Sequence, residues 1–408
     1  MAAVGLAAAR CIASDWPEFR GPTGQGHSTA AGLPVEWSDT RNVAWKIEVP
    51  GSGWSSPVVG GGRVFLTTGI AGEGETISLR VLAYSVSTGE RAWETEVFAP
   101  GELKPQPRHK KNSHASPTPI LEGERVYVHF GAHGTACLDR AGKVLWRNNG
   151  NSYDSVHGNG GSPALVGDLL IYSADGEAGP AVVALDKASG AVRWRSARVA
   201  QVKQKFSFST PLAITVSGRV QVVSPGSGAV MALDPVDGRE IWRARYGNGY
   251  SVVPRPVLAH GSIFIGTGYN RADLLAVRVD GAGDVTDTHI VWRTTKGAPL
   301  TPSLLVIGDE LYGVDDKGVA TCWDARSGEV RWQERIDGNY SASPLAAEGR
   351  IYFLSEEGVA TVVKAGRTFE KLAVNKLGER ALASMAAVPG ALLIRGEKHL
   401  FRIAGPRG

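Results

Sequence analysis

The chain has few cysteines, no long apolar run and almost balanced charge, and each absence excludes a class of protein. Its three cysteines, Cys11, Cys137 and Cys322, are odd in number and widely spaced, so they form neither a disulfide framework nor a zinc motif. No apolar stretch reaches the roughly 18 residues that a transmembrane helix needs. The formal net charge of +4 over 408 residues is too small to indicate nucleic-acid binding.

Familiar catalytic motifs are also absent. The sequence contains no G-x-S-x-G, no H-E-x-x-H and no G-x-x-x-x-G-K phosphate loop. Four histidines, His109, His114, His129 and His133, lie close together in the sequence. We interpret them as ordinary buried or surface histidines and expect no metal site. The lack of a catalytic phrase favours a binding protein over an enzyme.

Residues 1–14 are small and mostly apolar, and they resemble the end of a secretory signal. A charged first region is missing, however, and Arg10 interrupts the apolar run. A lipoprotein signal would make Cys11 the lipidated residue, although Arg10 directly before it argues against that. We expect an exported protein of the bacterial periplasm or cell envelope. The alternative is a disordered N-terminus.

Glycine and tryptophan, by contrast, are abundant. The 52 glycines and 11 tryptophans are typical of many short strands joined by tight turns. A phrase of the form A-L-D-x-x-[ST]-G-x-x-x-W recurs about every 40 to 50 residues, a period typical of propeller blades. Its copies include RVLAYSVSTGERAWET, AVVALDKASGAVRWRS, AVMALDPVDGREIWRA and VATCWDARSGEVRWQE.

Each residue type in this phrase has a structural role. The aspartate ends a strand, and its carboxylate can accept hydrogen bonds from N–H groups of the turn. The glycine can take the left-handed conformation that a short hairpin needs. The tryptophan follows on the returning strand, where we expect its indole to pack between neighbouring blades. Cys137 and Cys322 share one column of the repeat and are expected to be unpaired core residues of different blades.

A second phrase, mostly Ser-Pro or Thr-Pro, precedes each copy of the first. Proline lacks the N–H group, so within a sheet it belongs at a free edge, which in a propeller is the strand that lines the channel. Eight copies mark eight inner strands, at Pro57, Pro117, Pro163, Pro211, Pro254, Pro302, Pro344 and, in degenerate form, Met385. The outer-strand aromatic residues also number eight if Phe369 is counted.

The two ends of the chain complement each other. The segment VAWKIEV is an outer strand with no inner strands before it, and the last repeat has inner strands with no outer strand after it. We therefore predict an all-β protein, an eight-bladed β-propeller with four-stranded antiparallel blades. The N-terminal outer strand completes the C-terminal blade, and residues 15–408 form a single domain.

From about Trp37 onward, the phrase A-x-D-x-x-T-G-x-x-x-W resembles the repeat of the pyrroloquinoline quinone (PQQ)-type propellers. That family includes quinoprotein alcohol dehydrogenases and outer-membrane assembly lipoproteins of the BamB type. The BamB type implies a scaffold for a protein partner. The alternative is a PQQ-dependent dehydrogenase with calcium, but those enzymes stack PQQ on a disulfide between adjacent cysteines, and this chain has no such pair. A glycan-binding propeller is the third hypothesis.

Loops that precede the inner strands, and loops between the second and third strands, are predicted to surround one mouth of the channel. The candidate site residues at this mouth are Lys111, Asn112, His157, Lys205, Lys296, Asp175, Asp315 and Glu356. Six residues before its proline, each of three blades carries a lysine, and we expect these lysines to converge and hold a small anionic ligand. The alternatives are a structural network of salt bridges and a solvated rim.

Overall fold

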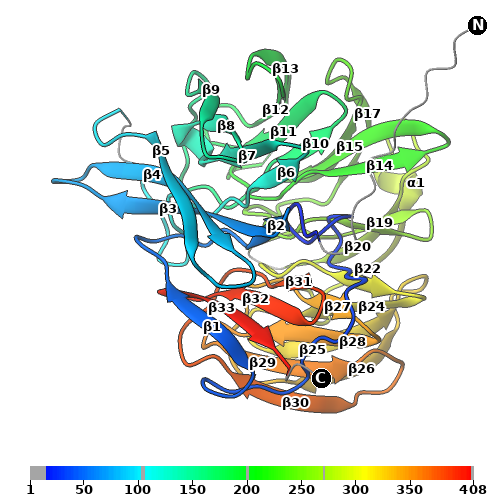
Figure 1. Ribbon diagram of the computed structural model, residues 1–408. Helices are drawn as coiled ribbons and strands as arrows, with labels where there is room; N and C mark the ends of the chain where they lie inside the picture. Colours follow the sequence, from blue (N-terminus) through cyan, green and yellow to red (C-terminus); the bar gives the residue numbers. More distant parts are fainter. Residues whose placement is uncertain (1–14, 103–105, 199–201, 270–271, 406–408) are drawn as a thin grey trace, which may run out of the picture.

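The computed structural model describes residues 15–102, 106–198, 202–269 and 272–405. These residues form eight sheets, the blades, which are antiparallel apart from one short parallel strand at the edge of blade 4 and are arranged in a ring around a central channel (Figure 1). The predicted eight-bladed β-propeller is thereby confirmed. Residues 1–14, with the expected secretory signal or disordered N-terminus, lie outside the described residues.

The first four blades follow one another along the chain. Blade 1 consists of β2 (Val58–Gly60), β3 (Arg63–Ala71), β4 (Ile77–Ser85) and β5 (Arg91–Phe98). Blade 2 consists of β6 (Ile120–Glu122), β7 (Arg125–His129), β8 (Thr135–Asp139) and β9 (Val144–Asn148), with the 3-10 helix η1 (Gly131–His133) after β7. Blade 3 consists of β10 (Ala164–Val166), β11 (Leu169–Ala174), β12 (Ala181–Asp186) and β13 (Val192–Ala197). Blade 4 consists of β14 (Leu212–Val216), β15 (Arg219–Gly226), β16 (Ala229–Leu233) and β17 (Glu240–Arg245).

Blades 5 to 7 continue the ring, with one insertion. Blade 5 consists of β18 (Val257–Ala259), β19 (Ser262–Gly266), β20 (Leu274–Arg278) and β22 (Ile290–Thr294). Its insertion holds α1 (Thr286–His289) and β21 (Gly283–Asp284), which pairs in parallel with β17 and gives blade 4 a fifth strand. Blade 6 consists of β23 (Leu305–Ile307), β24 (Glu310–Val314), β25 (Val319–Asp324) and β26 (Val330–Arg335). Blade 7 consists of β27 (Leu345–Ala347), β28 (Arg350–Leu354), β29 (Val359–Lys364) and β30 (Lys371–Lys376).

Blade 8 combines strands from both ends of the chain. It contains β31 (Ala386–Val388), β32 (Ala391–Arg395) and β33 (His399–Ala404), and its outer strand is β1 (Val43–Glu48). β1 runs antiparallel to β33, with Lys46 opposite Phe401. This is the pairing expected from the complementary chain ends. The described part of the chain contains no helix with the length and apolar character needed to cross a membrane.

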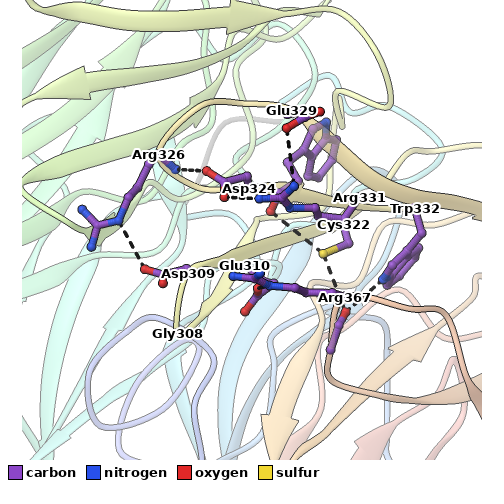
Figure 2. Close-up of polar contacts among 12 residues, drawn as sticks. Gly308, Asp309, Glu310, Cys322, Asp324, Arg326, Glu329, Arg331, Trp332 and Arg367 are labelled. Atoms are coloured by element: carbon purple, nitrogen blue, oxygen red, sulfur yellow. Dashed lines mark hydrogen bonds and ion pairs between the residues drawn. The ribbon is translucent and has the colours of Figure 1, made fainter.

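The repeated phrase links each blade to the next. In six blades the indole N–H of the tryptophan donates to a backbone carbonyl in the turn before the outer strand of the following blade; these residues are Trp45, Trp93, Trp146, Trp194, Trp292 and Trp332. Trp332 Nε1 donates to Gly366 O at 3.0 Å, and Figure 2 shows Trp332 close to Arg367, which forms an ion pair with Glu310 at 2.8 Å. The link from Trp45 to Val86 crosses the closure of the ring, from blade 8 to blade 1.

The glycine of the phrase lets neighbouring blades approach closely. Gly190 has φ 75°, and a Cβ atom there would collide with the ring of Trp146 from the preceding blade. The aspartate shapes the same turn, since Asp186 Oδ1 accepts hydrogen bonds from the N–H groups of Ala188 and Ser189. Aspartate, glycine and tryptophan thus form one interblade contact, which confirms the structural interpretation of the phrase.

Two details of the repeat differ from the prediction. Trp242 donates to Gln221 Oε1 of its own blade, at 2.9 Å, and not to the next blade. Phe369 lies before β30, and the strand position of the tryptophan is taken by Ala373, opposite Val362. Counting Phe369 as the eighth outer-strand aromatic was therefore wrong. Cys137 and Cys322 are buried and unpaired, as predicted.

Residues 15–28 cross the end of the channel at which the inner strands finish, and residues 29–37 continue beside blades 7 and 8 to the outer strand β30, where Trp37 N donates to Asn375 Oδ1. Trp16 exchanges backbone hydrogen bonds with Val59 in β2, and Gly26 O accepts a hydrogen bond from Ala346 N in β27. Between these contacts, Glu18 forms an ion pair with Arg255, which directly precedes blade 5. In Figure 1 this N-terminal segment, in dark blue, lies across the middle of the ring. The segment closes one end of the channel.

Candidate functional site

With one end closed, the channel becomes a cup of about 650 Å³ that opens on the opposite face. The loops before the inner strands and the loops between second and third strands supply its wall, as predicted. Phe19 of the N-terminal segment also lines it. The volume lies within the range of about 300 to 1,000 Å³ typical of small-molecule sites.

Seven hydroxyl side chains occupy equivalent positions of seven blades around the cup, and we call them the hydroxyl ring: Ser56, Thr118, Ser162, Thr210, Ser303, Ser343 and Ser384. Each lies two residues before an inner strand and accepts a hydrogen bond from a backbone N–H of the preceding blade. Ser56 N, for example, donates to Thr118 Oγ1 at 3.0 Å. Arg255 holds the eighth position, and its guanidinium pairs with Glu18 in the floor. The hydroxyl ring therefore joins the blades where they are closest to the axis.

Aromatic side chains form one side of the wall. Phe206 contacts His157 and Tyr250 edge to face, with ring centroids 5.1 and 5.5 Å apart, and Tyr250 contacts Tyr269 at 6.3 Å. Phe208 packs beside Phe206. We call these five residues the aromatic arc; they come from the loops around blades 3 to 5. The arc gives the cup an amphipathic wall.

Charged groups lie across the cup from the arc. Lys111, from the loop before blade 2, reaches Glu356 after β28 in blade 7, with Nζ 2.7 Å from Oε1. Glu356 also accepts a hydrogen bond from Ser341 Oγ at 2.6 Å. Asp316 accepts hydrogen bonds from Leu300 N and from the backbone and side chain of Thr301. Burial raises the pKa of Asp316, while these hydrogen bonds and Lys111 oppose the rise.

The structure brings four of the predicted site residues together. Lys111, Asn112 and His157 line the cup, and Glu356 holds the Lys111 ammonium. Asn112 Nδ2 donates to His157 O at 3.0 Å, which ties the loops before blades 2 and 3 to each other. Asp316, which follows the candidate Asp315 in the same loop, lines the cup as well.

The other predicted site residues lie elsewhere. Lys205 and Lys296 are not among the described residues that line the cup. Asp175 is fully buried against Arg198, with 2.6 Å between Oδ1 and Nε. Asp315 caps its own turn by accepting hydrogen bonds from Lys317 N and Val319 N.

The three predicted lysines do not all line the cup, and for Lys205 one reason is that proline is not a fixed register mark. Pro211 directly precedes its inner strand, β14, whereas Pro117 and Pro302 lie three residues before β6 and β23. Counting back from the prolines therefore aligned Lys205 with Lys111 and Lys296. Relative to the start of the inner strand, however, Lys205 is offset from the other two lysines by two residues. Lys111 is the one lysine or arginine among the described residues of the cup wall.

Sequence reasoning missed the hydroxyl ring and most of the aromatic arc. The signal for the ring was present, because a serine or threonine stands beside the proline in most copies of the second phrase. We had interpreted that phrase only as a strand marker. The arc had no repeated signal, since its members come from loops of unequal length.

The residues of the cup do not fit the calcium-bound PQQ of the dehydrogenases. Within the described ranges, no three His, Cys, Asp or Glu side chains converge as metal ligands would. The two carboxylates at the cup already have partners. Glu356 pairs with Lys111 and accepts a hydrogen bond from Ser341, and Asp316 accepts hydrogen bonds from Leu300 and Thr301. Cys137 and Cys322, in blades 2 and 6, cannot provide the adjacent pair on which PQQ stacks in those enzymes.

Comparison with known proteins places the chain beside one group of propellers. The family model described as outer membrane protein assembly factor BamB matches residues 27–172, 80–289 and 281–369. The outer membrane protein assembly factor BamB of Nitrosomonas eutropha is 25% identical over 296 residues, which cover 69% of this chain and 66% of that protein. The BamB of Alkalilimnicola ehrlichii is 28% identical over 150 residues, 36% of this chain and 38% of that protein. The chain thus matches less than two thirds of the length of either relative.

Solved structures share the fold at low sequence identity. BamB from Moraxella catarrhalis superposes with a TM-score of 0.64 and 13% identity, covering 90% of this chain and 98% of that one. The quinohemoprotein alcohol dehydrogenase from Comamonas testosteroni gives a TM-score of 0.70 and 13% identity, covering 98% of this chain and 82% of that one. At this identity both likenesses concern the fold alone.

Proposed function

Because the chain belongs to the family of the outer membrane protein assembly factor BamB, we propose that it is a scaffold of the bacterial cell envelope that binds a protein partner. The observation that carries the proposal is the family match, which extends from residue 27 to residue 369. Curated relatives bear the name of an assembly factor and not of an enzyme. The proposal places this chain, like them, at the envelope.

The ring itself supports a scaffolding role. Six tryptophan links and the hydroxyl ring hold the blades to one another, so the loops at the open face are carried on a stiff frame. Interfaces between pre-formed surfaces lose little conformational entropy on binding. We therefore assign the partner to the face at which the cup opens.

Position-specific photo-crosslinking in cells of the source organism tests this assignment. A photoreactive residue replaces Glu73 or Lys317, two exposed positions in loops between second and third strands, on the cup face. The controls replace Val236, in the turn before β17, and Leu145, on the outer strand β9; both side chains are exposed. We expect one defined adduct from Glu73 or Lys317 and none from the controls. Adducts of equal yield from all four positions, or no adduct at all, would refute the proposal.

The alternative of a PQQ-dependent dehydrogenase makes a different prediction. Addition of PQQ and calcium to the purified protein should then give quinone absorbance and dye-linked oxidation of alcohols or sugars. The scaffold proposal predicts neither signal, because the carboxylates of the cup are already engaged.

A further inference from the structure

The hydroxyl ring has unused hydrogen-bond donors. Its seven side chains are between 2% and 7% exposed, so they are buried while still facing the cup. Each hydroxyl oxygen accepts one backbone N–H, and none of the seven donates its proton to another residue within the described ranges. A buried hydrogen-bond donor that has no acceptor destabilises the structure around it. The hydroxyl ring therefore favours a ligand with many oxygen atoms that can accept hydrogen bonds.

The aromatic arc adds a second requirement. Its rings stand beside the hydroxyl ring, with Phe208 two residues before Thr210, and Tyr269 at the rim is 50% exposed. Aromatic faces carry partial negative charge and attract polarised C–H groups as well as apolar surface. A ligand that uses both features has oxygen atoms along its edges and C–H groups on a flat face.

The charges of the cup do not favour an anion. The ammonium of Lys111 is already paired with Glu356 at 2.7 Å, and Asp316 supplies a carboxyl group to the wall. The amide of Gln204 lines the same wall and can both donate and accept. The wall thus presents mixed donors and acceptors with no excess of positive charge.

We infer that the cup binds a small neutral saccharide, with sugar oxygens on the hydroxyl ring and the C–H face of the ring against the aromatic arc. Sugars combine edge oxygens, which accept and donate hydrogen bonds, with apolar faces. The inference concerns the cup of the isolated protein and does not depend on the proposed protein partner. Failure of one proposal therefore leaves the other standing.

Isothermal titration calorimetry on the purified chain tests the inference, with cellobiose, maltose and N,N′-diacetylchitobiose as probes. Sodium acetate and inorganic phosphate serve as anionic comparisons. We expect saturable binding of at least one disaccharide that changes little with salt, because no ion pair forms. The inference fails if no disaccharide saturates the protein, or if only the anions bind and salt weakens their binding.

Two matched pairs of variants locate the site for the disaccharide that binds. Thr210→Val keeps the side-chain shape but removes the hydroxyl, whereas Thr210→Ser keeps the hydroxyl. Tyr269→Ala removes an exposed ring of the arc, and Val236→Ala is its control on the opposite face. We expect Thr210→Val and Tyr269→Ala to raise Kd by about tenfold or more, and the other two to leave it within about twofold.

Thermal unfolding separates loss of binding from loss of fold. Thr210→Val leaves Ser162 N without its acceptor, so its Tm should fall and binding must be measured well below that Tm. Tyr269→Ala should leave Tm nearly unchanged because the ring is half exposed. Unchanged Kd in both folded variants would overturn the assignment of the sugar to the cup.

Discussion

Asp175 and Arg198 form a buried ion pair within blade 3, on the side that faces blade 4. Arg198 donates to Asp175 and also to Ser224 O at 2.9 Å, so the guanidinium is held from several sides. Burial raises the pKa of Asp175 to about 6, although Arg198 opposes the rise. The sequence had placed this carboxylate at the channel mouth. Its burial instead indicates a structural role.

A double-mutant cycle at this pair tests that role. Asp175→Ala leaves a buried guanidinium uncompensated and should lower the free energy of unfolding by about 3 to 5 kcal/mol. The double variant Asp175→Ala, Arg198→Met should cost clearly less than the sum of the two single variants, because no unpaired charge remains. Urea unfolding measures each difference. Additive costs, or a stable Asp175→Ala, would contradict the structural role.

His129 in β7 is a buried histidine whose pKa is strongly lowered. Burial lowers its pKa to about 3, and the ring is held by Thr135 Oγ1 at 2.8 Å and by Tyr172, 4.2 Å between ring centroids. The native state therefore keeps His129 neutral, while the unfolded chain takes up a proton below about pH 6.5. Because the unfolded state then binds more protons, acid destabilises the fold.

The expected pH dependence can be isolated with one variant. Below about pH 6.5, His129 should reduce the free energy of unfolding by up to about 1.4 kcal/mol per pH unit, until the pKa near 3 is reached. His129→Gln should lower stability at pH 7 but remove this slope. The raised pKa of Asp175 has the opposite effect on the pH dependence of stability. The quantity to compare is therefore the difference between the variant and the wild type in the slope of unfolding free energy against pH. Parallel stability profiles from pH 7 to pH 4 would show that His129 is not buried as described.

The glycine of the repeated phrase determines how closely two blades can approach. Gly190 and Gly218 have nearly the same φ, 75° and 78°, but only Gly190 faces a tryptophan; nothing lies within 4 Å of a Cβ at Gly218. Gly218→Ala should lower the free energy of unfolding by about 1 to 3 kcal/mol through backbone strain alone. Gly190→Ala should lower the free energy of unfolding by about 1 to 3 kcal/mol more than Gly218→Ala does, because Trp146 must move. Urea unfolding of both variants gives the difference, and equal costs would mean that the blade contact contributes nothing.

This same phrase explains why so much of the fold follows from the sequence. Asp186, Gly190 and Trp194 act within one hairpin and its neighbour, and the pattern repeats, so the element order and the number of blades can be predicted. The cup is different, because its wall takes single residues from loops of unequal length. Lys111 and Glu356 are far apart in sequence, and no local pattern predicts that they meet. The shift of the prolines between blades then misaligned Lys205 with Lys111 and Lys296.

Ring and cup both depend on the N-terminal segment. The N-terminal segment closes one end of the channel, and its Trp16, Leu33 and Trp37 are buried in the core cluster shared by blades 7, 8 and 1. β1 follows directly and supplies the outer strand of blade 8, with Trp45 linked to Val86 of blade 1. A propeller without this strand would have an open edge at β33 and would lose the tryptophan link across its closure. The central claim is that one continuous segment forms the floor and closes the ring.

Equilibrium unfolding of three nested truncations tests this claim most directly, with size-exclusion chromatography alongside. Removal of residues 2–14 is the control and should leave Tm unchanged, because none of the described contacts is lost. Removal of residues 2–37 should lower Tm but keep a single cooperative transition, since β1 stays in blade 8. Removal of residues 2–49 should abolish cooperative unfolding or cause aggregation through the open edge of β33. A monomer lacking residues 2–49 that unfolds cooperatively at the Tm of the full chain would contradict the account.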